Sequence, residues 1–255
     1  MNNAPIGVFD SGMGGLSVWR EIRKRLPHES LIYFGDGLHC PYGEKPAAEV
    51  VGYIDEAIRT LIAHDCKLIV LACNTATMTA VKYLRATYPL PFVGMEPAVK
   101  PAAATTETGT IGVLATRASL GSDWFGELSG RYAAGVRVVT AVGEGFVEAV
   151  EADEEHTPAT RRLVERAVAP LLAAGADRIV LGCTHYPFLA DVIEEVIANP
   201  SVQLIDPAPA IARRVEWLLS QDGRLAEPTH VPELLFLSAA GAEYAEKLRR
   251  RATAL

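Results

Sequence analysis

The chain has 255 residues, enough for one large domain or two small ones, and 49% of them are hydrophobic and 22% charged, as in soluble globular proteins. Its net charge of −7 argues against nucleic acid or an anionic membrane as the main partner. No stretch approaches the roughly 20 apolar residues of a membrane span, and the N-terminus carries no signal-peptide pattern. The four cysteines show neither a C-x-x-C pair nor a zinc-like spacing. We therefore expect a cytoplasmic protein with free thiols and no bound metal.

Short apolar runs alternate with amphipathic stretches along most of the chain. The predicted strands are Ile6–Phe9, Ser30–Gly35, Leu68–Ala72, Phe92–Gly94, Thr110–Leu114, Arg137–Ala141, Arg178–Gly182, Val202–Ile205 and Leu234–Leu237. The clearest predicted helices are Val50–His64 and Thr157–Ala174, and the final segment of the chain is expected to form two more, Pro209–Ser220 and Ala242–Arg251. This alternation is typical of βαβ units, and it predicts an α/β fold with doubly wound, mostly parallel sheets.

One segment of the sequence occurs twice, 110 residues apart. The first copy is Leu68–Thr75 (LIVLACNT) and the second is Arg178–His185 (RIVLGCTH). The similarity continues beyond each copy. An acid followed by Pro-Ala stands 23 residues after each cysteine, at Glu96 and at Asp206. A repeat of this kind predicts two structurally similar halves.

A weaker match between Ile6–Ser11 and Ile111–Thr116 extends the repeat to the first strand of each half. The sequence therefore predicts two similar domains. The first comprises residues 1–97 together with 208–255, because the final segment is expected to dock on the first half. The second comprises residues 98–207.

The repeat places Cys73 and Cys183 at the ends of equivalent strands. Ligands of doubly wound sheets bind beyond the carboxyl ends of the strands, and a following helix N-terminus favours a thiolate there. A single buried cysteine is commonly just a small hydrophobic residue. Two cysteines in matching positions, each followed by polar residues, predict instead two thiols that face one cleft. That is the outline of a two-base site for proton transfer.

Three further residues could assist these thiols. His185 stands two residues after Cys183 and could hydrogen-bond it. Asp10 could assist Cys73 in the same way, although an aspartate in this place could also cap the following helix. Glu151 could assist as well, but it lies in an acidic run of the kind that usually forms a solvated helix face.

The glycine-rich loop Asp10–Gly15 is close to a dinucleotide-binding fingerprint, and Asp36 ends the next strand where a ribose-binding acid would stand. Two features disfavour that interpretation. Ser17 occupies the place of the third glycine, and Asp10 would direct a negative charge toward a pyrophosphate. The loop could still bind an anion at the start of a helix.

Taken together, these motifs resemble the glutamate racemases of the cofactor-independent aspartate/glutamate racemase family. The motifs that carry the resemblance span nearly the whole chain and are Phe9–Gly15, Pro41–Gly43, Ala72–Ala76, Glu96–Ala98 and Gly182–Pro187. The resemblance implies two α/β domains with the active site between them, glutamate as substrate, no cofactor, and a role in supplying D-glutamate for peptidoglycan. We also expect a homodimer.

The resemblance also implies roles for individual residues. Cys73 and Cys183 match the two acid/base residues, the first serving D-glutamate and the second L-glutamate. Asp10 and His185 match the assisting groups, and Asp36 and Glu151 match positions also implicated in the family. The residues that match substrate contacts are Ser11, Pro41, Tyr42, Gly43, Asn74, Thr75, Thr116 and Thr184.

The chain departs from the family pattern at four places, none of which includes the two cysteines. The departures are the segment Asp36–Cys40 in place of Asp-Thr-Ala-Arg, Pro46 in place of a serine, Val142–Phe146 without a Cys-Pro pair, and Ser238–Gly241 in place of a Thr-Gly-Asp-like turn. A related racemase that acts on aspartate or another amino acid therefore stays open as an alternative.

Two alternatives belong to other functional classes. A hydrolase with a cysteine nucleophile would use Cys183 with His185 and would not need Cys73. A non-catalytic protein that binds an amino acid would tolerate the loss of either cysteine. An enzyme with pyridoxal phosphate is disfavoured, because none of the six lysines stands at the end of a repeated strand.

Overall fold

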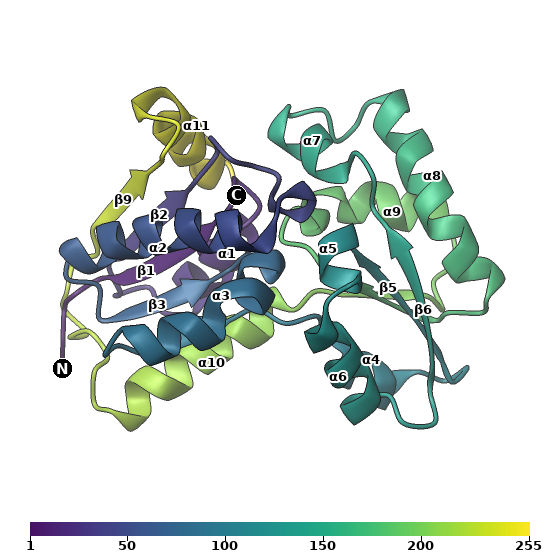
Figure 1. Cartoon of the computed structure of the whole chain (residues 1–255), viewed down its shortest axis with the longest axis horizontal. Helices are drawn as coiled ribbons and strands as arrows, with labels where there is room; N and C mark the ends of the chain where they lie inside the picture. The colour runs from purple at the N-terminus through teal and green to yellow at the C-terminus, as the bar shows by residue number, and fades with distance from the viewer. The chain divides into compact units, whose positions relative to one another are not determined.

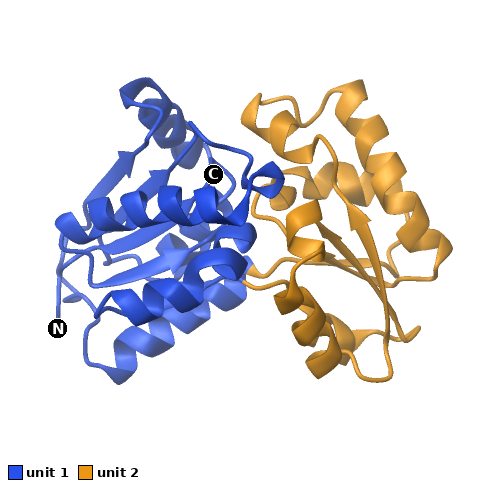
Figure 2. Ribbon diagram, in the orientation of Figure 1, with its two compact units in different colours: residues 1–95, 208–255 blue, residues 96–207 orange.

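A computed structural model describes residues 1–255, and these form two compact units (Figures 1 and 2). Unit 1 comprises Met1–Met95 and Ala208–Leu255, and unit 2 comprises Glu96–Pro207. The sequence predicted the first boundary two residues later. The chain passes between the units at the two copies of the acid-Pro-Ala motif, so this part of the repeat marks both crossings.

Unit 1 is built on a five-stranded sheet of order β4-β3-β1-β2-β9, in which all neighbours are parallel. Its strands are β1 (Ile6–Asp10), β2 (Leu31–Gly35), β3 (Leu68–Leu71), β4 (Phe92–Gly94) and β9 (Leu234–Leu237). Its helices are α1 (Leu16–Arg25), the 3-10 helix η1 (Tyr42–Glu44), α2 (Ala47–Ala63), α3 (Asn74–Thr87), α10 (Ala208–Gln221) and α11 (Ala242–Thr253). Helix α1 packs against α10, and α2 packs against α3. Strands β1, β2 and β3 are buried along their whole length, as expected for parallel strands covered on both faces.

Unit 2 has a four-stranded parallel sheet of order β6-β5-β7-β8. Its strands are β5 (Thr110–Ala115), β6 (Arg137–Val142), β7 (Arg178–Leu181) and β8 (Gln203–Ile205). Its helices are α4 (Val99–Thr105), α5 (Arg117–Leu120), α6 (Asp123–Tyr132), α7 (Phe146–Glu151), α8 (Pro158–Ala173), the 3-10 helix η2 (Tyr186–Leu189) and α9 (Ala190–Ile197). Helices α8 and α9 pack together, as do α4 and α6. The edge strand β6 is partly exposed.

The internal repeat of the sequence is also a repeat of topology. Strands β1 to β4 of unit 1 correspond in order and position to β5 to β8 of unit 2, and β9 is an addition at the edge of the first sheet. The prediction of two similar parallel-sheet α/β domains is confirmed. Cys73 and Cys183 follow the equivalent strands β3 and β7.

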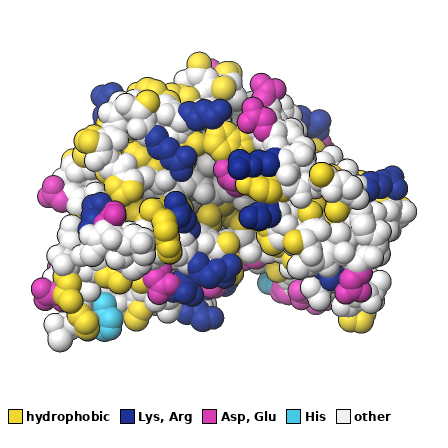
Figure 3. Space-filling model, turned by 90° about the horizontal axis from the view of Figure 1, so that it is seen from below, with side chains coloured by type: hydrophobic (Ala, Val, Ile, Leu, Met, Phe, Trp, Pro, Cys, Tyr) yellow, Lys and Arg dark blue, Asp and Glu magenta, His cyan; other side chains and the backbone are white.

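None of the helices is both long and apolar enough to cross a bilayer. The net charge of −7 does not make every surface acidic, since Lys and Arg side chains stand beside Asp and Glu side chains on the face that Figure 3 shows. Side chains of both signs are therefore interspersed there.

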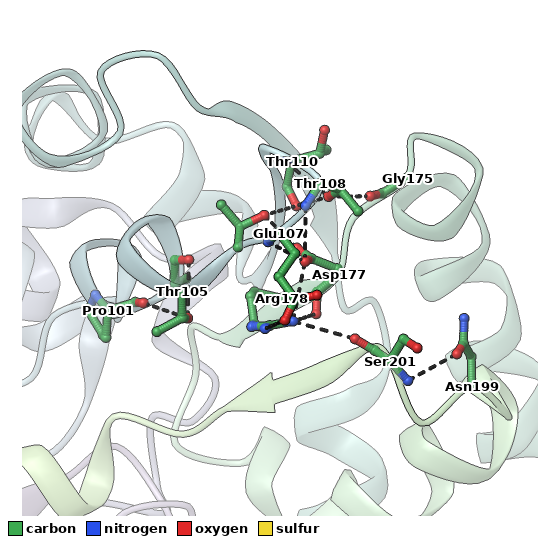
Figure 4. Close-up of polar contacts among 12 residues, drawn as sticks. Pro101, Thr105, Glu107, Thr108, Thr110, Gly175, Asp177, Arg178, Asn199 and Ser201 are labelled. Carbon is green, nitrogen blue, oxygen red and sulfur yellow. Dashed lines mark hydrogen bonds and ion pairs between the residues drawn. The ribbon is translucent and has the colours of Figure 1, made fainter.

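A polar network holds the edge of unit 2 at which β5 and β7 begin (Figure 4). The carboxylate of Asp177, which is buried, accepts hydrogen bonds from the hydroxyl of Thr106 at 2.5 Å and from the backbone amides of Glu107 and Thr108 at 2.6 and 3.2 Å. The Arg178 guanidinium lies 3.3 Å from the same carboxylate. Burial alone would raise the pKa of Asp177, but these hydrogen bonds and the charge of Arg178 bring it below its usual value.

Asp177→Asn is expected to lower the free energy of unfolding at pH 7 by about 2–3 kcal/mol, because charge-assisted hydrogen bonds are lost and an amide group faces backbone donors. The pKa of this carboxyl is lower in the folded than in the unfolded chain, where it is about 3.9. Its contribution is therefore complete above that value and is lost as the pH falls through the folded pKa. Urea unfolding at a series of pH values should show the gap between variant and wild type closing below about pH 4. The exposed Asp222→Asn is the control, and a gap independent of pH would contradict the prediction.

Candidate functional site

Cys73 lies between a buried strand and a helix, and it is the N-cap residue of α3. Its side chain is almost fully buried, with the residue 6% exposed. The Sγ atom accepts a hydrogen bond from the backbone amide of Ala76 at 3.4 Å and lies 3.7 Å from Ser11 Oγ. A backbone donor at the start of a helix favours a negatively charged sulfur. This geometry favours the thiolate, which is the form of a cysteine that can act as a base.

Asp10 ends β1 and is fully buried. Its Oδ1 atom accepts a hydrogen bond from the amide of Gly12 at 2.9 Å. The interpretation of Asp10 as a helix N-cap is wrong, because α1 begins at Leu16 and its N-cap residue is Gly15. A Cβ atom on Gly15 would lie 2.6 Å from the Asp10 Cβ, so only glycine allows the loop to close over this carboxylate.

Asp36 and Tyr42 form a second buried polar group in unit 1. The Tyr42 hydroxyl donates a hydrogen bond to Asp36 Oδ2 at 2.6 Å. Burial is the main reason that the pKa of Tyr42 is raised, and the charge and hydrogen bond of Asp36 add to it, followed by the charges of Cys73 and Asp10. The hydroxyl is therefore protonated near neutral pH. Asp36, Cys73 and Asp10 therefore lie within electrostatic range of Tyr42.

Asn74 carries a buried amide whose oxygen and nitrogen have no hydrogen-bond partner within the protein. The residue is 2% exposed and directly follows Cys73. A buried polar group left unpaired costs about 1–3 kcal/mol, so such a group in a folded protein calls for an explanation. An amide offers one acceptor and two donors, which suit the ammonium and carboxylate groups of an amino acid. Thr75, the next residue, is also buried.

In unit 2 a cysteine, a histidine and a glutamate form a chain of contacts. The Sγ atom of Cys183 lies 3.8 Å from His185 Nδ1. On the other side of the ring, His185 Nε2 lies 2.7 Å from Oε1 of Glu151, the last residue of α7. Because Glu151 accepts the proton of Nε2, a neutral His185 directs its Nδ1 lone pair toward the thiol. The histidine is thus oriented to accept the proton of Cys183.

The surroundings of the two cysteines are not equivalent, contrary to the prediction that each leads directly into a helix. After Cys183 the chain forms a turn and the 3-10 helix η2, and α9 begins only at Ala190. Pro187 stands in η2 and disfavours an α-helical conformation for the residue before it. Cys183 therefore lacks the helix N-terminus that Cys73 has. Its side chain instead contacts His185, which in turn contacts Glu151.

The structure places the remaining predicted residues within their own units. Ser11, the turn Pro41–Gly43 and Thr75 belong to loops or helix starts at the carboxyl edge of the unit 1 sheet. Thr184 is buried beside Cys183. Thr116 is the N-cap of α5, where its side chain accepts a hydrogen bond from Ser119 N at 3.2 Å and donates one to Ser119 Oγ at 2.9 Å.

One residue that sequence analysis did not single out also belongs to this region. His39 Nδ1 lies 2.9 Å from Asp36 Oδ1. A histidine three residues from a strand-end aspartate is a signal that could have drawn attention to it. The sequence interpretation treated the segment only as a departure from the family pattern.

Comparison with known proteins agrees with this arrangement. A family model described as Asp/Glu/Hydantoin racemase matches residues 14–215. A glutamate racemase of Herpetosiphon aurantiacus is 46% identical to the chain over 250 residues, which cover 98% of each sequence.

Two solved structures match nearly the whole chain. A glutamate racemase isoform of Bacillus anthracis matches with a TM-score of 0.89 and 30% identity, covering 100% of this chain and 96% of that one. A glutamate racemase of Francisella tularensis in complex with D-glutamate matches with a TM-score of 0.86 and 26% identity, covering 100% of this chain and 95% of that one.

Proposed function

The chain belongs to the Asp/Glu/hydantoin racemase family, and we propose that it interconverts L- and D-glutamate with two cysteines as acid/base residues and without a cofactor. The observation that carries the proposal is the pair of buried thiols that follow equivalent strands of two repeated sheets. Racemisation removes the Cα proton from one face of the substrate and returns a proton to the other. Two bases from two similar half-molecules meet that requirement.

Each direction of the reaction begins with one cysteine as thiolate and the other as thiol. A thiol has a reference pKa of about 8.5, so both forms are accessible near neutral pH. In the proposal, Cys73 takes the proton of D-glutamate and Cys183 that of L-glutamate, and the opposite thiol delivers a proton to the planar, carbanion-like intermediate. At the end of each turnover the two cysteines have exchanged protonation states.

The Cα proton of an amino acid is very weakly acidic, so the negative charge that develops on its removal must be stabilised. Buried donors aimed at the substrate carboxylates would do this without reorganising in each turnover. The side chains of Asn74, Thr75 and Thr184 supply such donors next to the cysteines. The unpaired amide of Asn74 supports this role most directly.

The two thiols are activated by different means in this proposal. A backbone amide of α3 stabilises the thiolate of Cys73. His185, oriented by Glu151, accepts the proton of Cys183. The two proton transfers can therefore be slowed separately by mutation.

A hydrolase with a cysteine nucleophile is the second candidate, because Cys183, His185 and Glu151 also have the order of contacts of a catalytic triad. Such an enzyme would give no role to Cys73. Hydrolytic activity that is retained in Cys73→Ser would favour the hydrolase.

The purified protein is expected to racemise L-glutamate after exhaustive chelation and dialysis. The measurement is loss of the circular dichroism signal of L-glutamate, with L-aspartate and other amino acids tested in parallel. Activity confined to aspartate would contradict the proposed substrate. A requirement for added pyridoxal phosphate would contradict the proposed mechanism, and binding without turnover would indicate a non-catalytic amino-acid-binding protein.

The proposal also extends to the setting of the enzyme. We propose that it works in the cytoplasm as a homodimer and supplies D-glutamate for peptidoglycan synthesis. Light scattering coupled to size-exclusion chromatography tests the dimer, and a mass near 27.4 kDa at working concentrations would contradict it.

A further inference from the structure

The imidazole of His39 is held on two sides by groups from different elements of unit 1. Its Nδ1 atom lies 2.9 and 3.0 Å from the two carboxylate oxygens of Asp36, which follows β2. Its ring stacks on that of Tyr53 in α2, with the centroids 3.7 Å apart and the planes at 6°. A ring with both a face and a nitrogen engaged has little freedom to rotate.

Asp36 depends on this histidine for one of its two side-chain partners. The carboxylate is buried, with its side chain 2% exposed, and its other partner is the hydroxyl of Tyr42 at 2.6 Å. A buried carboxylate is costly unless hydrogen bonds satisfy it. Without His39, the carboxylate keeps only one side-chain donor and can rotate. That rotation would release the hydroxyl of Tyr42.

Backbone contacts tie this group to the loop beside Cys73. The amide of Asp36 donates to the carbonyl of Asp10 at 3.0 Å, and the amide of Gly37 donates to the carbonyl of Ser11 at 2.9 Å. Gly37 has a φ of +67°, and the Tyr244 ring of α11 lies 2.6 Å from where its Cβ would be. The backbone of Asp36 and Gly37 is therefore fixed by α11 and by the Asp10 loop, whereas the carboxylate of Asp36 can still rotate.

We propose that His39 is a positioning residue for substrate binding. By donating a hydrogen bond to Asp36 it fixes the carboxylate that holds Tyr42, and so it holds the turn Pro41–Gly43 in place. The inference rests on the proposed function and on the family resemblance, which implies that this turn contacts the substrate. His39 itself takes no part in proton transfer to or from the substrate. Its loss should weaken binding more than it slows turnover.

Two substitutions separate the hydrogen bond from the ring stack. His39→Asn keeps a donor in the place of Nδ1 but loses the ring, whereas His39→Phe keeps the ring over Tyr53 but loses the donor. A pocket of about 280 Å³ adjoins the ring, so the larger side chain can be accommodated. His64→Phe makes the same change at an exposed histidine of the same unit and is the matched control.

His39→Phe is expected to raise KM for both enantiomers about tenfold, which corresponds to about 1.4 kcal/mol of binding energy. Its kcat should change by less than about threefold. His39→Asn should restore KM to within about threefold of the wild-type value, and His64→Phe should not change it. Equal KM values in wild type and His39→Phe, or equal losses in His39→Phe and His39→Asn, would overturn the proposal. Circular dichroism melts exclude an unfolded variant.

A measurement without substrate tests the same hydrogen bond independently of the reaction. In ¹⁵N-histidine spectra at neutral pH, with His39→Phe used for assignment, His39 Nδ1 should carry a proton, and its signal should change in Asp36→Asn. An Nδ1 atom without a proton would overturn the inference even in an active enzyme. Wild-type protein that fails to racemise glutamate would refute the proposed function, while the spectra would still decide whether His39 donates to Asp36.

Discussion

Cys73→Ser and Cys183→Ser are each expected to reduce racemisation by about a thousandfold or more. A serine hydroxyl is far too weakly acidic to exchange a proton as a thiol does at neutral pH. Each variant should nevertheless exchange the α-proton of one enantiomer with solvent, because one cysteine survives. Cys73→Ser should exchange L-glutamate, and Cys183→Ser should exchange D-glutamate. Proton NMR in deuterium oxide measures exchange, and circular dichroism measures racemisation.

Cys66 provides the control for the loss of a thiol. It precedes β3, at the end of that strand opposite to Cys73, and burial, with a further contribution from Asp65, raises the pKa of its thiol to about 12. Cys66→Ala should keep racemisation near the wild-type rate.

Wild-type enzyme in deuterium oxide should place solvent deuterium in the product at the first turnover. Substantial turnover in either serine variant, or return of the original proton to the product, would contradict a two-base mechanism.

The fold could be predicted from the sequence because it depends on local patterns that occur twice. Apolar runs of four to six residues separated by amphipathic stretches predict buried parallel strands, and the repeated acid-Pro-Ala motif stands where the chain changes units. The identity of the cap of α1 could not be predicted in this way. Asp10 is a favourable N-cap residue by type, but the tight approach at Gly15 moves the helix start to Leu16.

The cysteines of the site could be predicted because the repeat singles them out, and His185 could be predicted as a partner of Cys183 because it stands two residues away, whereas the contact of Glu151 with His185 could not. Glu151 is 34 residues away from His185 along the chain and lies in an acidic run that resembles a solvated helix face. Only the packing of α7 beside η2 brings its carboxylate to the histidine. The contact of His39 with Tyr53 likewise joins a loop to a helix, and no local pattern encodes it.

The contact between His185 and Cys183 leads to the second large effect. His185→Asn is expected to lower kcat/KM about a hundredfold, because Cys183 loses the group that accepts its proton. Glu151→Gln is expected to lower kcat/KM about tenfold, because the imidazole ring of His185 loses its fixed orientation. The two enantiomers have the same free energy, so the equilibrium constant is one and kcat/KM must stay equal in both directions. A comparison of kcat/KM between directions therefore cannot locate the defect.

Substrate deuterated at Cα can locate it. In His185→Asn the transfer at Cys183 should limit the rate, so α-deuterated L-glutamate, whose label Cys183 removes, should show a large primary isotope effect. α-Deuterated D-glutamate should show a small one, because Cys73 removes its label before the slow step. Asp10→Asn is the matched variant on the other side and should show the reverse pattern if Asp10 assists Cys73. Equal isotope effects for both enantiomers in His185→Asn would mean that the histidine supports the site as a whole rather than the proton transfer of Cys183.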